Sequence, residues 1–281
     1  EGTMPAQAKT VTVTYDTNAY LLTVDYVYPD NTVAYASHTA DVKYGTTYYV
    51  ESPAITGYTP NTAVVTGTMP AQATTVTVTY DTNTYVLTIN YGTPVSDTYT
   101  ADVKYGVEYN VTSPDITGYT PDQTVVSGTM GADNVTVDVN YIINKYKLTV
   151  NYNFVDGAPA ATTYTDSVNY NETYSVTSPA VTGYTPNTAV VTGTMPAQDK
   201  SVDVVYNVNS YDLTVNYKYA DGTTAAPAHT ESVNYNVSYS VPTPFIDTYM
   251  PDVDTVKGTM DTAAVTVDVT FKQVVMNPVS D

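Results

Sequence analysis

Three aspartates lie beside residue pairs that are typical of tight turns. Asp30 precedes an asparagine, and Asp156 and Asp221 each precede a glycine. Carboxylates together with backbone carbonyls are suitable ligands for a hard cation such as calcium. The alternating acidic loop of an EF-hand is absent, and an aspartate beside a turn also binds its own backbone. The pattern favours turn formation and leaves a calcium site at these aspartates open.

Tyrosine is the other residue type that could build a binding surface, since it makes up 30 of the 281 residues. An aromatic face can receive a sugar ring while hydroxyl groups bind its polar edges. Most of the tyrosines follow the apolar alternation of strands, which predicts packing in a core or an interface. Four tyrosines beside expected turns are the candidates for ligand contact: Tyr58, Tyr119, Tyr184 and Tyr249.

The residues that catalysis requires are scarce. A nucleophilic triad needs a histidine near a serine and a carboxylate. The two histidines, His38 and His229, fall in expected hairpin loops far apart in the chain. Cysteine is absent, which excludes disulfides, thiolate zinc sites and cysteine nucleophiles. We expect no enzyme here, and no cofactor apart from the open question of calcium.

The surface is expected to be strongly acidic. The net charge is −19, from 28 acidic and 9 basic residues, and all the basic residues are lysines. Such a chain lacks the positive face that binding to nucleic acid or to an anionic membrane requires. A negatively charged glycan would be repelled, so any glycan ligand would have to be neutral or bridged by calcium. Glycosylation would require a source organism that modifies Asn-x-Ser/Thr sequons, which begin at Asn110, Asn134, Asn171 and Asn236.

The positioning of these residues depends on a repeat. The tripeptide Gly-Thr-Met begins at Gly2, Gly67, Gly128, Gly193 and Gly258, so consecutive copies are 65, 61, 65 and 65 residues apart. A period this long indicates tandem copies of one small folded unit. We therefore expect the last strand of a preceding repeat at 1–19, repeat 1 at 20–84, repeat 2 at 85–145, repeat 3 at 146–210, a divergent repeat 4 at 211–272 and a tail at 273–281. Because the sequence begins inside a repeat, we expect it to be a piece of a longer protein.

Each repeat reads as a set of strands with little or no helix. In repeat 3 apolar residues alternate from Tyr146 to Phe154, then an Asp-Gly turn leads to a second strand through Tyr164 and Val176 with a bend at Asn171. The segment Gly-Tyr-Thr-Pro predicts another turn, and the last strand is expected near 202–206, with counterparts at 11–15 and 76–80. The joint at 207–210 is short, which restricts bending between repeats. The sequence predicts a mainly β, linear tandem array.

The order of these signals resembles the MucBP (mucin-binding protein) repeats of bacterial surface proteins, with a weaker similarity to internalin B-repeat modules. The resemblance is carried by Leu-Thr-Val-Asn-Tyr at 213–217 with Asp221-Gly222, by Val-Asn-Tyr at 233–235 with Tyr239, and by the Gly-Tyr and Gly-Thr-Met elements. It implies a β-grasp-like, ubiquitin-like module of an extracellular adhesin, in some cases associated with mucin glycans. Repeat 4 departs from the pattern with Thr-Tyr-Met at 248–250, which is typical of the end of an array.

These observations support three hypotheses for an extracellular cell-surface protein. The preferred one is an extended, semi-rigid stalk that presents a distal binding domain, supported by the repeats and the short joints. The first alternative is an array that binds mucin-type glycans or host surface proteins weakly and many times. The second is lateral self-association through strands left at a sheet edge, for which the segments 11–15, 76–80 and 135–141 are the candidates. We expect no nucleic acid partner and no membrane insertion.

Overall fold

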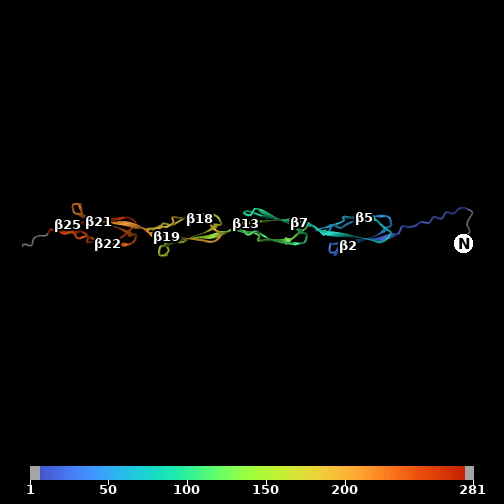
Figure 1. Cartoon of the computed structure of the whole chain (residues 1–281), viewed down its shortest axis with the longest axis horizontal. Coiled ribbons are helices and arrows are strands. Elements are labelled where there is room, and N and C mark those ends of the chain that lie inside the picture. Colours follow the sequence, from blue (N-terminus) through green and yellow to red (C-terminus); the bar gives the residue numbers. More distant parts are fainter. Residues whose placement is uncertain (1–6, 276–281) are drawn as a thin grey trace, which may run out of the picture. The chain divides into compact units, whose positions relative to one another are not determined.

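The computed structural model describes residues 7–275 and divides the chain into two compact units. Of the described residues, the first unit comprises 7–116 and 120–142, and the second comprises 117–119 and 143–275. The described residues form strands β1 to β25 and contain no helix, which confirms the mainly β, tandem fold (Figure 1). The first strands of repeats 2, 3 and 4 begin at Thr84, Lys145 and Ser210.

Repeat 3 shows the arrangement of one module. β14 (Lys145–Phe154) pairs antiparallel with β15 (Tyr164–Asn169) and parallel with β19 (Lys200–Val208). β19 also pairs antiparallel with the short β17 (Tyr184–Pro186), which gives the sheet order β15-β14-β19-β17. β16 (Thr173–Thr177) and β18 (Val190–Thr194) form a separate two-stranded sheet. The first and last strands lie parallel at the centre of the mixed sheet, as expected for a β-grasp-like module.

The other repeats follow the same plan. Repeat 1 comprises β1 (Ala19–Val27), β2 (Val33–Lys43), β3 (Thr47–Glu51), β4 (Tyr58–Pro60), β5 (Val64–Thr68) and β6 (Thr74–Thr82). Repeat 2 comprises β7 (Thr84–Tyr91), β8 (Asp97–Lys104), β9 (Glu108–Thr112), β10 (Tyr119–Pro121), β11 (Val125–Thr129), β12 (Val135–Val139) and β13 (Tyr141–Ile143). Repeat 4 comprises β20 (Ser210–Tyr219), β21 (Thr224–Asn234), β22 (Ser238–Pro242), β23 (Tyr249–Pro251), β24 (Thr255–Thr259) and β25 (Val265–Gln273).

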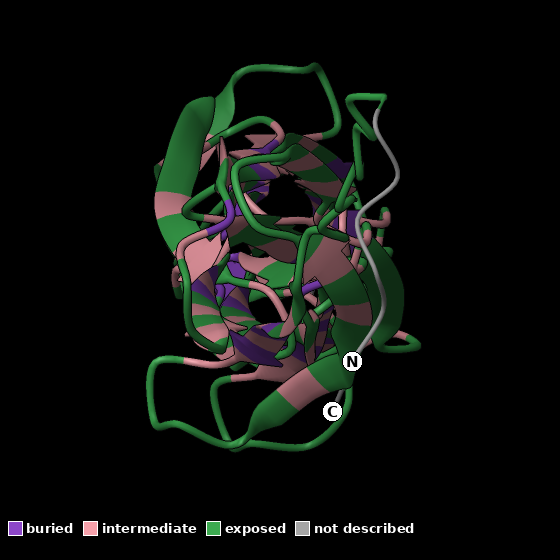
Figure 2. Cartoon of the chain, turned by 90° about the vertical axis from the view of Figure 1, so that its right-hand side faces the viewer, coloured by how far each residue is buried: buried purple, intermediate pink, exposed green. Residues whose placement is uncertain are grey.

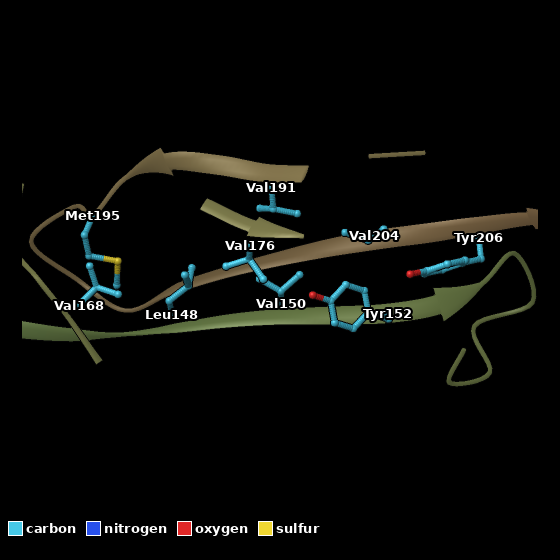
Figure 3. Packing of buried hydrophobic residues seen from close by; sticks show 9 residues of the cluster. All are labelled: Leu148, Val150, Tyr152, Val168, Val176, Val191, Met195, Val204 and Tyr206. Atoms are coloured by element: carbon cyan, nitrogen blue, oxygen red, sulfur yellow. The ribbon is translucent and has the colours of Figure 1, made fainter. Parts of the chain in front are cut away.

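Each repeat has its own hydrophobic core between its two sheets. In repeat 3 the core takes alternate residues of the two central strands, and Figure 3 shows Leu148 and Val150 facing the same interior as Val191 of the second sheet. Buried and exposed residues alternate along the strands (Figure 2), because successive side chains point to opposite faces. Met195 of Gly-Thr-Met is almost completely buried and closes one end of this core, as do Met69, Met130 and Met260 in the other repeats.

The expected second strand is in fact two strands that belong to different sheets. The chain turns between β15 and β16 at Asn171, whose φ of 61° lies in the left-handed region. Gly45, Gly106 and Asn236 hold the same position with φ of 77°, 75° and 62°. Glycine and asparagine adopt this conformation at low cost, which confirms the bend. The turn expected at Gly-Tyr-Thr-Pro is limited to Gly183, with φ of 77°, because the next three residues pair with β19 as β17.

The strand predicted at 11–15 is not formed. Val11, Val13 and Tyr15 are 74, 66 and 92% exposed, and no strand of the described residues pairs with this segment. Its counterpart β6 pairs with β1 along residues 74–79 and with β4 along residues 80–82, so β4 covers its second side only at that end. β12 is the outer member of its three-stranded sheet. Lateral self-association through such an edge stays a prediction, to be checked by light scattering against concentration.

Candidate functional site

Repeats 3 and 4 are connected by a single residue that lies outside the strands. Its backbone N–H, its backbone carbonyl and its side chain all form hydrogen bonds. Asn209 separates β19 from β20. Its N–H donates to the carbonyl oxygen of Gly183 at 2.9 Å, and its own carbonyl oxygen accepts from the N–H of Tyr235 at 2.8 Å. Its side-chain Oδ1 accepts from the hydroxyl of Thr185 at 2.7 Å. We call the set Gly183, Tyr184, Thr185, Asn209 and Tyr235 the joint of repeats 3 and 4.

Repeats 1 and 2 are connected by the same joint. The N–H of Asn83 donates to Gly57 at 2.8 Å, its carbonyl oxygen accepts from the N–H of Tyr105 at 2.9 Å, and its Oδ1 accepts from Thr59 at 2.6 Å. Within the second unit, Asn144 also donates to Gly118 at 2.9 Å and accepts from Tyr170 at 2.8 Å. The recurrence of one hydrogen-bond set shows that the joint is built by the repeated sequence.

Aromatic rings fill the joint around the glycine. The ring of Tyr184 lies 4.6 Å from that of Phe154 and 6.1 Å from that of Tyr235, with the second pair edge to face. Gly183 permits this packing, because a Cβ at that position would overlap with Cγ and Cδ1 of Tyr235. Aromatic pairs of this geometry contribute roughly 0.5–1.5 kcal/mol beyond their area burial. The following repeat is therefore held by ring contacts as well as by hydrogen bonds.

Two sequence candidates, Asp156 and Tyr184, share a groove beside this joint. The groove has a volume of about 570 Å³, and its lining includes Phe154, Tyr206 and Tyr235 in addition to those two residues. It therefore combines aromatic faces with a carboxylate. Such a surface could take the apolar face and hydroxyl groups of a neutral sugar. This groove brings two of the candidate residues together.

The turn aspartates bind their own hairpins. Oδ1 of Asp156 accepts from the N–H of Ala158 at 2.9 Å, and Oδ1 of Asp221 accepts the N–H and the hydroxyl of Thr223 at 2.9 and 2.6 Å. Asp30 makes the same two bonds with Thr32. The hydroxyl bonds, followed by the backbone bonds, hold the pKa of Asp30 and Asp221 below its usual range. Among residues 7–275 no three acidic, histidine or cysteine side chains gather closely enough to hold a metal ion.

The tyrosines selected from the sequence lie mainly at the joints. Tyr58, Tyr119 and Tyr184 are partly buried, and each packs edge to face on a tyrosine further along the chain: Tyr105, Tyr170 and Tyr235. Tyr249 packs at 4.7 Å on Tyr219 of its own repeat. The sequence interpretation missed the joint asparagines and the tyrosines at 105, 170 and 235. Their signal was present, since a tyrosine precedes each Gly or Asn bend and the asparagines recur with the repeat.

The histidines and sequons occupy structural positions. His38 and His229 lie on strands β2 and β21, so their expected placement in loops is wrong, because the pairing of the second strand extends this far. Asn110 lies on β9, and Asn171 and Asn236 form the bends. Oδ1 of Asn134 accepts from the N–H of Val86 at 2.8 Å. Across the described chain, no helix has the length and apolarity to span a membrane.

Comparisons with known proteins agree with the repeat architecture. Internalin J of Listeria monocytogenes serotype 4b (strain F2365) is 30% identical over 275 residues, covering 88% of this chain and 30% of the relative. Internalin J of Listeria monocytogenes serovar 1/2a (strain ATCC BAA-679 / EGD-e) is 29% identical over 209 residues, covering 68% and 24%. The chain thus spans less than a third of the length of these relatives.

Among solved structures, the chain has distant likenesses to the Bacillus anthracis TIE protein and to the type 2 repeat of the mucus binding protein MUB from Lactobacillus reuteri. The first has a TM-score of 0.47 at 9% identity, covering 90% of this chain and 66% of that one. The second has a TM-score of 0.23 at 16% identity, covering 68% and 100%. The family model of the MucBP domain matches residues 22–81, 83–142, 147–207 and 212–272. The chain is therefore a tandem array of four repeats that belong to the MucBP domain family.

Proposed function

We propose that the repeats form an extended, semi-rigid stalk in a bacterial cell-surface adhesin, where they hold a distal binding domain away from the cell envelope. The observation that carries this proposal is the joint. A flexible linker needs residues whose backbone torsions are free, whereas Asn83 and Asn209 each have the N–H, the carbonyl and the side chain engaged. The single-residue spacing leaves little length over which a bend could be distributed.

Further support comes from the repetition itself. The four cores use the same strand positions and the same buried methionine, so each repeat is a structural copy rather than a specialised site. A net charge of −19 favours mutual repulsion of parts of the chain and opposes collapse onto itself. Membership of the MucBP family and the similarity to internalin J favour a location on the outside of a bacterial cell.

Small-angle X-ray scattering of the 281-residue chain tests the stalk. We expect a scattering profile of one elongated particle. Insertion of Gly-Ser-Gly after Asn209 should shorten the mean end-to-end distance by creating a flexible hinge at that joint. The same insertion at the hairpin tip after Gly222 of repeat 4 should leave the profile unchanged, because that tip lies outside the joint. A compact or freely jointed profile of the unmodified chain contradicts the proposal.

The second candidate function is weak, repeated binding of neutral mucin-type glycans or of host surface proteins. The aromatic groove beside Tyr184 and Asp156 favours it. A glycan array and a mucin pull-down, each with and without calcium, measure such binding directly. Asp156→Asn is an informative variant, since it removes the carboxylate charge of this groove while its amide oxygen can keep the turn bond to Ala158. Binding that this variant weakens supports the binding array, and absence of binding in both assays supports the stalk alone.

A further inference from the structure

Repeat 4 differs from the other repeats at the three positions that form the first half of a joint. The position of Gly57, Gly118 and Gly183 is taken by Thr248, whose φ of 64° keeps the same left-handed conformation. The threonine of Gly-Tyr-Thr is replaced by Met250, and the joint asparagine by Val274. The N–H of Val274 still donates to the carbonyl oxygen of Thr248 at 2.8 Å. The backbone of a joint is thus retained while its side chains are changed.

Thr248 changes the surface onto which a following tyrosine would pack. At Gly183 a Cβ would overlap with Cγ and Cδ1 of Tyr235, which are atoms at the root of that side chain. The backbone of Tyr235 is fixed by the bond from its N–H to Asn209, so its ring could clear a Cβ only by leaving its place against Tyr184. A threonine adds a branched Cβ at this point. It therefore prevents a tyrosine of a following repeat from taking the place that Tyr235 has against repeat 3.

The other two replacements remove a hydrogen bond together. In repeats 1 and 3 the threonine hydroxyl donates to the joint asparagine at 2.6 and 2.7 Å. Met250 has no hydroxyl and Val274 has no side-chain acceptor, so neither partner of this bond remains in repeat 4. Removing both partners leaves no polar group unpaired, whereas losing only one would. The three changes consequently alter the surface that would contact a following repeat, and they leave no polar group of the lost hydrogen bond unpaired in repeat 4.

Repeat 1 carries the opposite half of a joint. The N–H of Tyr44 donates to the carbonyl oxygen of Asn18 at 2.9 Å, which is the bond that Tyr235 makes with Asn209. Tyr44 is 56% exposed, whereas Tyr105, Tyr170 and Tyr235 are partly buried against a preceding glycine. Asn18 and Tyr44 therefore form the second half of a joint. In the described part of the chain, no Gly-Tyr element packs on the ring of Tyr44.

We propose that the joint residues determine which repeats can be neighbours. Thr248, Met250 and Val274 make repeat 4 a terminator onto which no further MucBP repeat can dock, and Tyr44, whose N–H is bound to the joint asparagine Asn18, is the surface that a Gly-Tyr-Thr element of a MucBP repeat would contact. A second copy of this chain cannot supply that partner through repeat 4, since its end presents Thr248. The proposal concerns neighbour selection and holds whether the array is a stalk or a binding array.

The test appends a fifth repeat and measures how firmly it is held. A second copy of residues 210–272 is placed directly after Val274, in the unchanged chain and in a Thr248→Gly, Met250→Thr, Val274→Asn variant. Because the chain lacks cysteine, spin labels can be attached at Ser232→Cys and at its copy in the appended repeat. We expect double electron–electron resonance to give a broad distance distribution in the unchanged chain and a narrow one in the triple variant.

The joint of repeats 3 and 4 provides the reference distance distribution, and a threonine introduced at Gly183 provides the reverse experiment. Labels at Ser167→Cys and Ser232→Cys should give a narrow distribution, and Gly183→Thr should broaden it. Gly222→Thr is the matched control: it places threonine at a positive φ of 84°, at a hairpin tip away from the joint, where a Cβ would meet nothing within 4 Å. Circular dichroism establishes that each variant is folded. A narrow distribution for the unchanged five-repeat chain, or a broad one for the folded triple variant, overturns the proposal. Failure of the stalk would appear instead in the scattering of the four-repeat chain.

Discussion

The hydroxyl of Tyr206 donates a 2.5 Å hydrogen bond to the carbonyl oxygen of Pro179 although the tyrosine is completely buried. The neighbouring hydroxyl of Ser178 donates to the carbonyl oxygen of Thr188 at 2.7 Å. Together the two bonds tie the proline-containing segment after β16 to the core. Tyr80 and Tyr141 make the same bond to Pro53 and Pro114, at 2.6 and 2.7 Å. Repeat 4 has Phe271 at this position.

Tyr206→Phe should therefore destabilise repeat 3. The substitution leaves the ring in place but deprives the Pro179 carbonyl of its donor, and a lost hydrogen bond of this kind costs about 1 kcal/mol. Urea unfolding of the chain, followed by circular dichroism, measures the change in the free energy of unfolding. Phe271→Tyr in repeat 4 is the reciprocal variant, which should be neutral or stabilising if its hydroxyl reaches Pro244. An unchanged stability of Tyr206→Phe would show that the bond contributes nothing.

The buried tyrosines should make the chain sensitive to alkali. Burial raises the pKa of Tyr80 and Tyr206 above the ordinary value of 10.0, and repulsion from Tyr26 and Tyr152 adds to the rise. A raised pKa means that folding favours the neutral phenol. This contribution to stability is complete below pH 10.0 and is lost as the pH rises through the raised pKa values. Urea midpoints measured across this window should fall, and a tyrosine absorbance titration should show a late phase that coincides with unfolding. Normal titration of every tyrosine in the folded chain would refute this.

The glycine of Gly-Thr-Met should not tolerate a side chain. Gly193 pairs with Tyr174 across β16 and β18, and a Cβ at Gly193 would press on Cζ of Tyr174 at 2.7 Å. Gly193→Ala should therefore displace the tyrosine ring and cost about 1–3 kcal/mol, the range for overpacking. Gly131→Ala is the control, since nothing lies within 4 Å of a Cβ there. Thermal unfolding of both variants gives the comparison, and equal melting temperatures would contradict the packing argument.

Calcium removal should leave the melting temperature unchanged. The oxygens of Asp30, Asp156 and Asp221 that accept backbone N–H groups are already used by the turns. Melting curves with calcium and with a chelator test this, and Asp221→Asn is the matched variant because an amide oxygen can keep the turn bond. The depressed pKa of Asp221 also predicts that its contribution is present above pH 3.8 and is lost as the pH falls through the lowered pKa. A chelator that destabilises the unchanged chain and spares the variant would establish a calcium site.

Thr248→Gly should stabilise repeat 4. A threonine with φ of 64° holds its branched Cβ in the left-handed region, which costs roughly 1–2 kcal/mol relative to a relaxed conformation. Glycine removes that strain but increases the freedom of the unfolded chain, so the net gain should be about 1 kcal/mol. Calorimetric melting of the chain measures it. A lower melting temperature would mean that the threonine makes a favourable contact that outweighs its strain.

The sequence predicted strands, core residues and turns correctly where a single local rule, such as strand alternation or the need for a positive φ, determines the structure. Alternation placed Leu148, Val150 and Tyr152 in the core, because a strand buries every second residue. Turn chemistry placed the bend at Asn171 and the hairpin at Gly157, since both require positive φ. The buried Met195 was missed, because a methionine after Gly-Thr and before Pro reads as part of a turn.

The joint could not be derived in the same way, since it depends on contacts between residues far apart in the sequence. Tyr184 and Tyr235 lie far apart in the sequence, and the antiparallel pairings of β17 with β19 and of β20 with β21 bring them together on either side of Asn209. The strand predicted at 11–15 failed for the related reason that alternation specifies a strand only where a partner is available. Local sequence patterns therefore predicted the strands and turns of each repeat, whereas the contacts between repeats depend on strand pairing that these patterns do not specify.

The parallel pairing of the first and last strands has a mechanical consequence for each repeat. A pull on the two ends of repeat 3 enters at the start of β14 and leaves at the end of β19, so it acts along both strands in opposite directions. The paired residues, from Leu148 with Lys200 to Phe154 with Tyr206, are then sheared together and cannot be opened one at a time. A module connected in this way resists tension with all of its central hydrogen bonds at once.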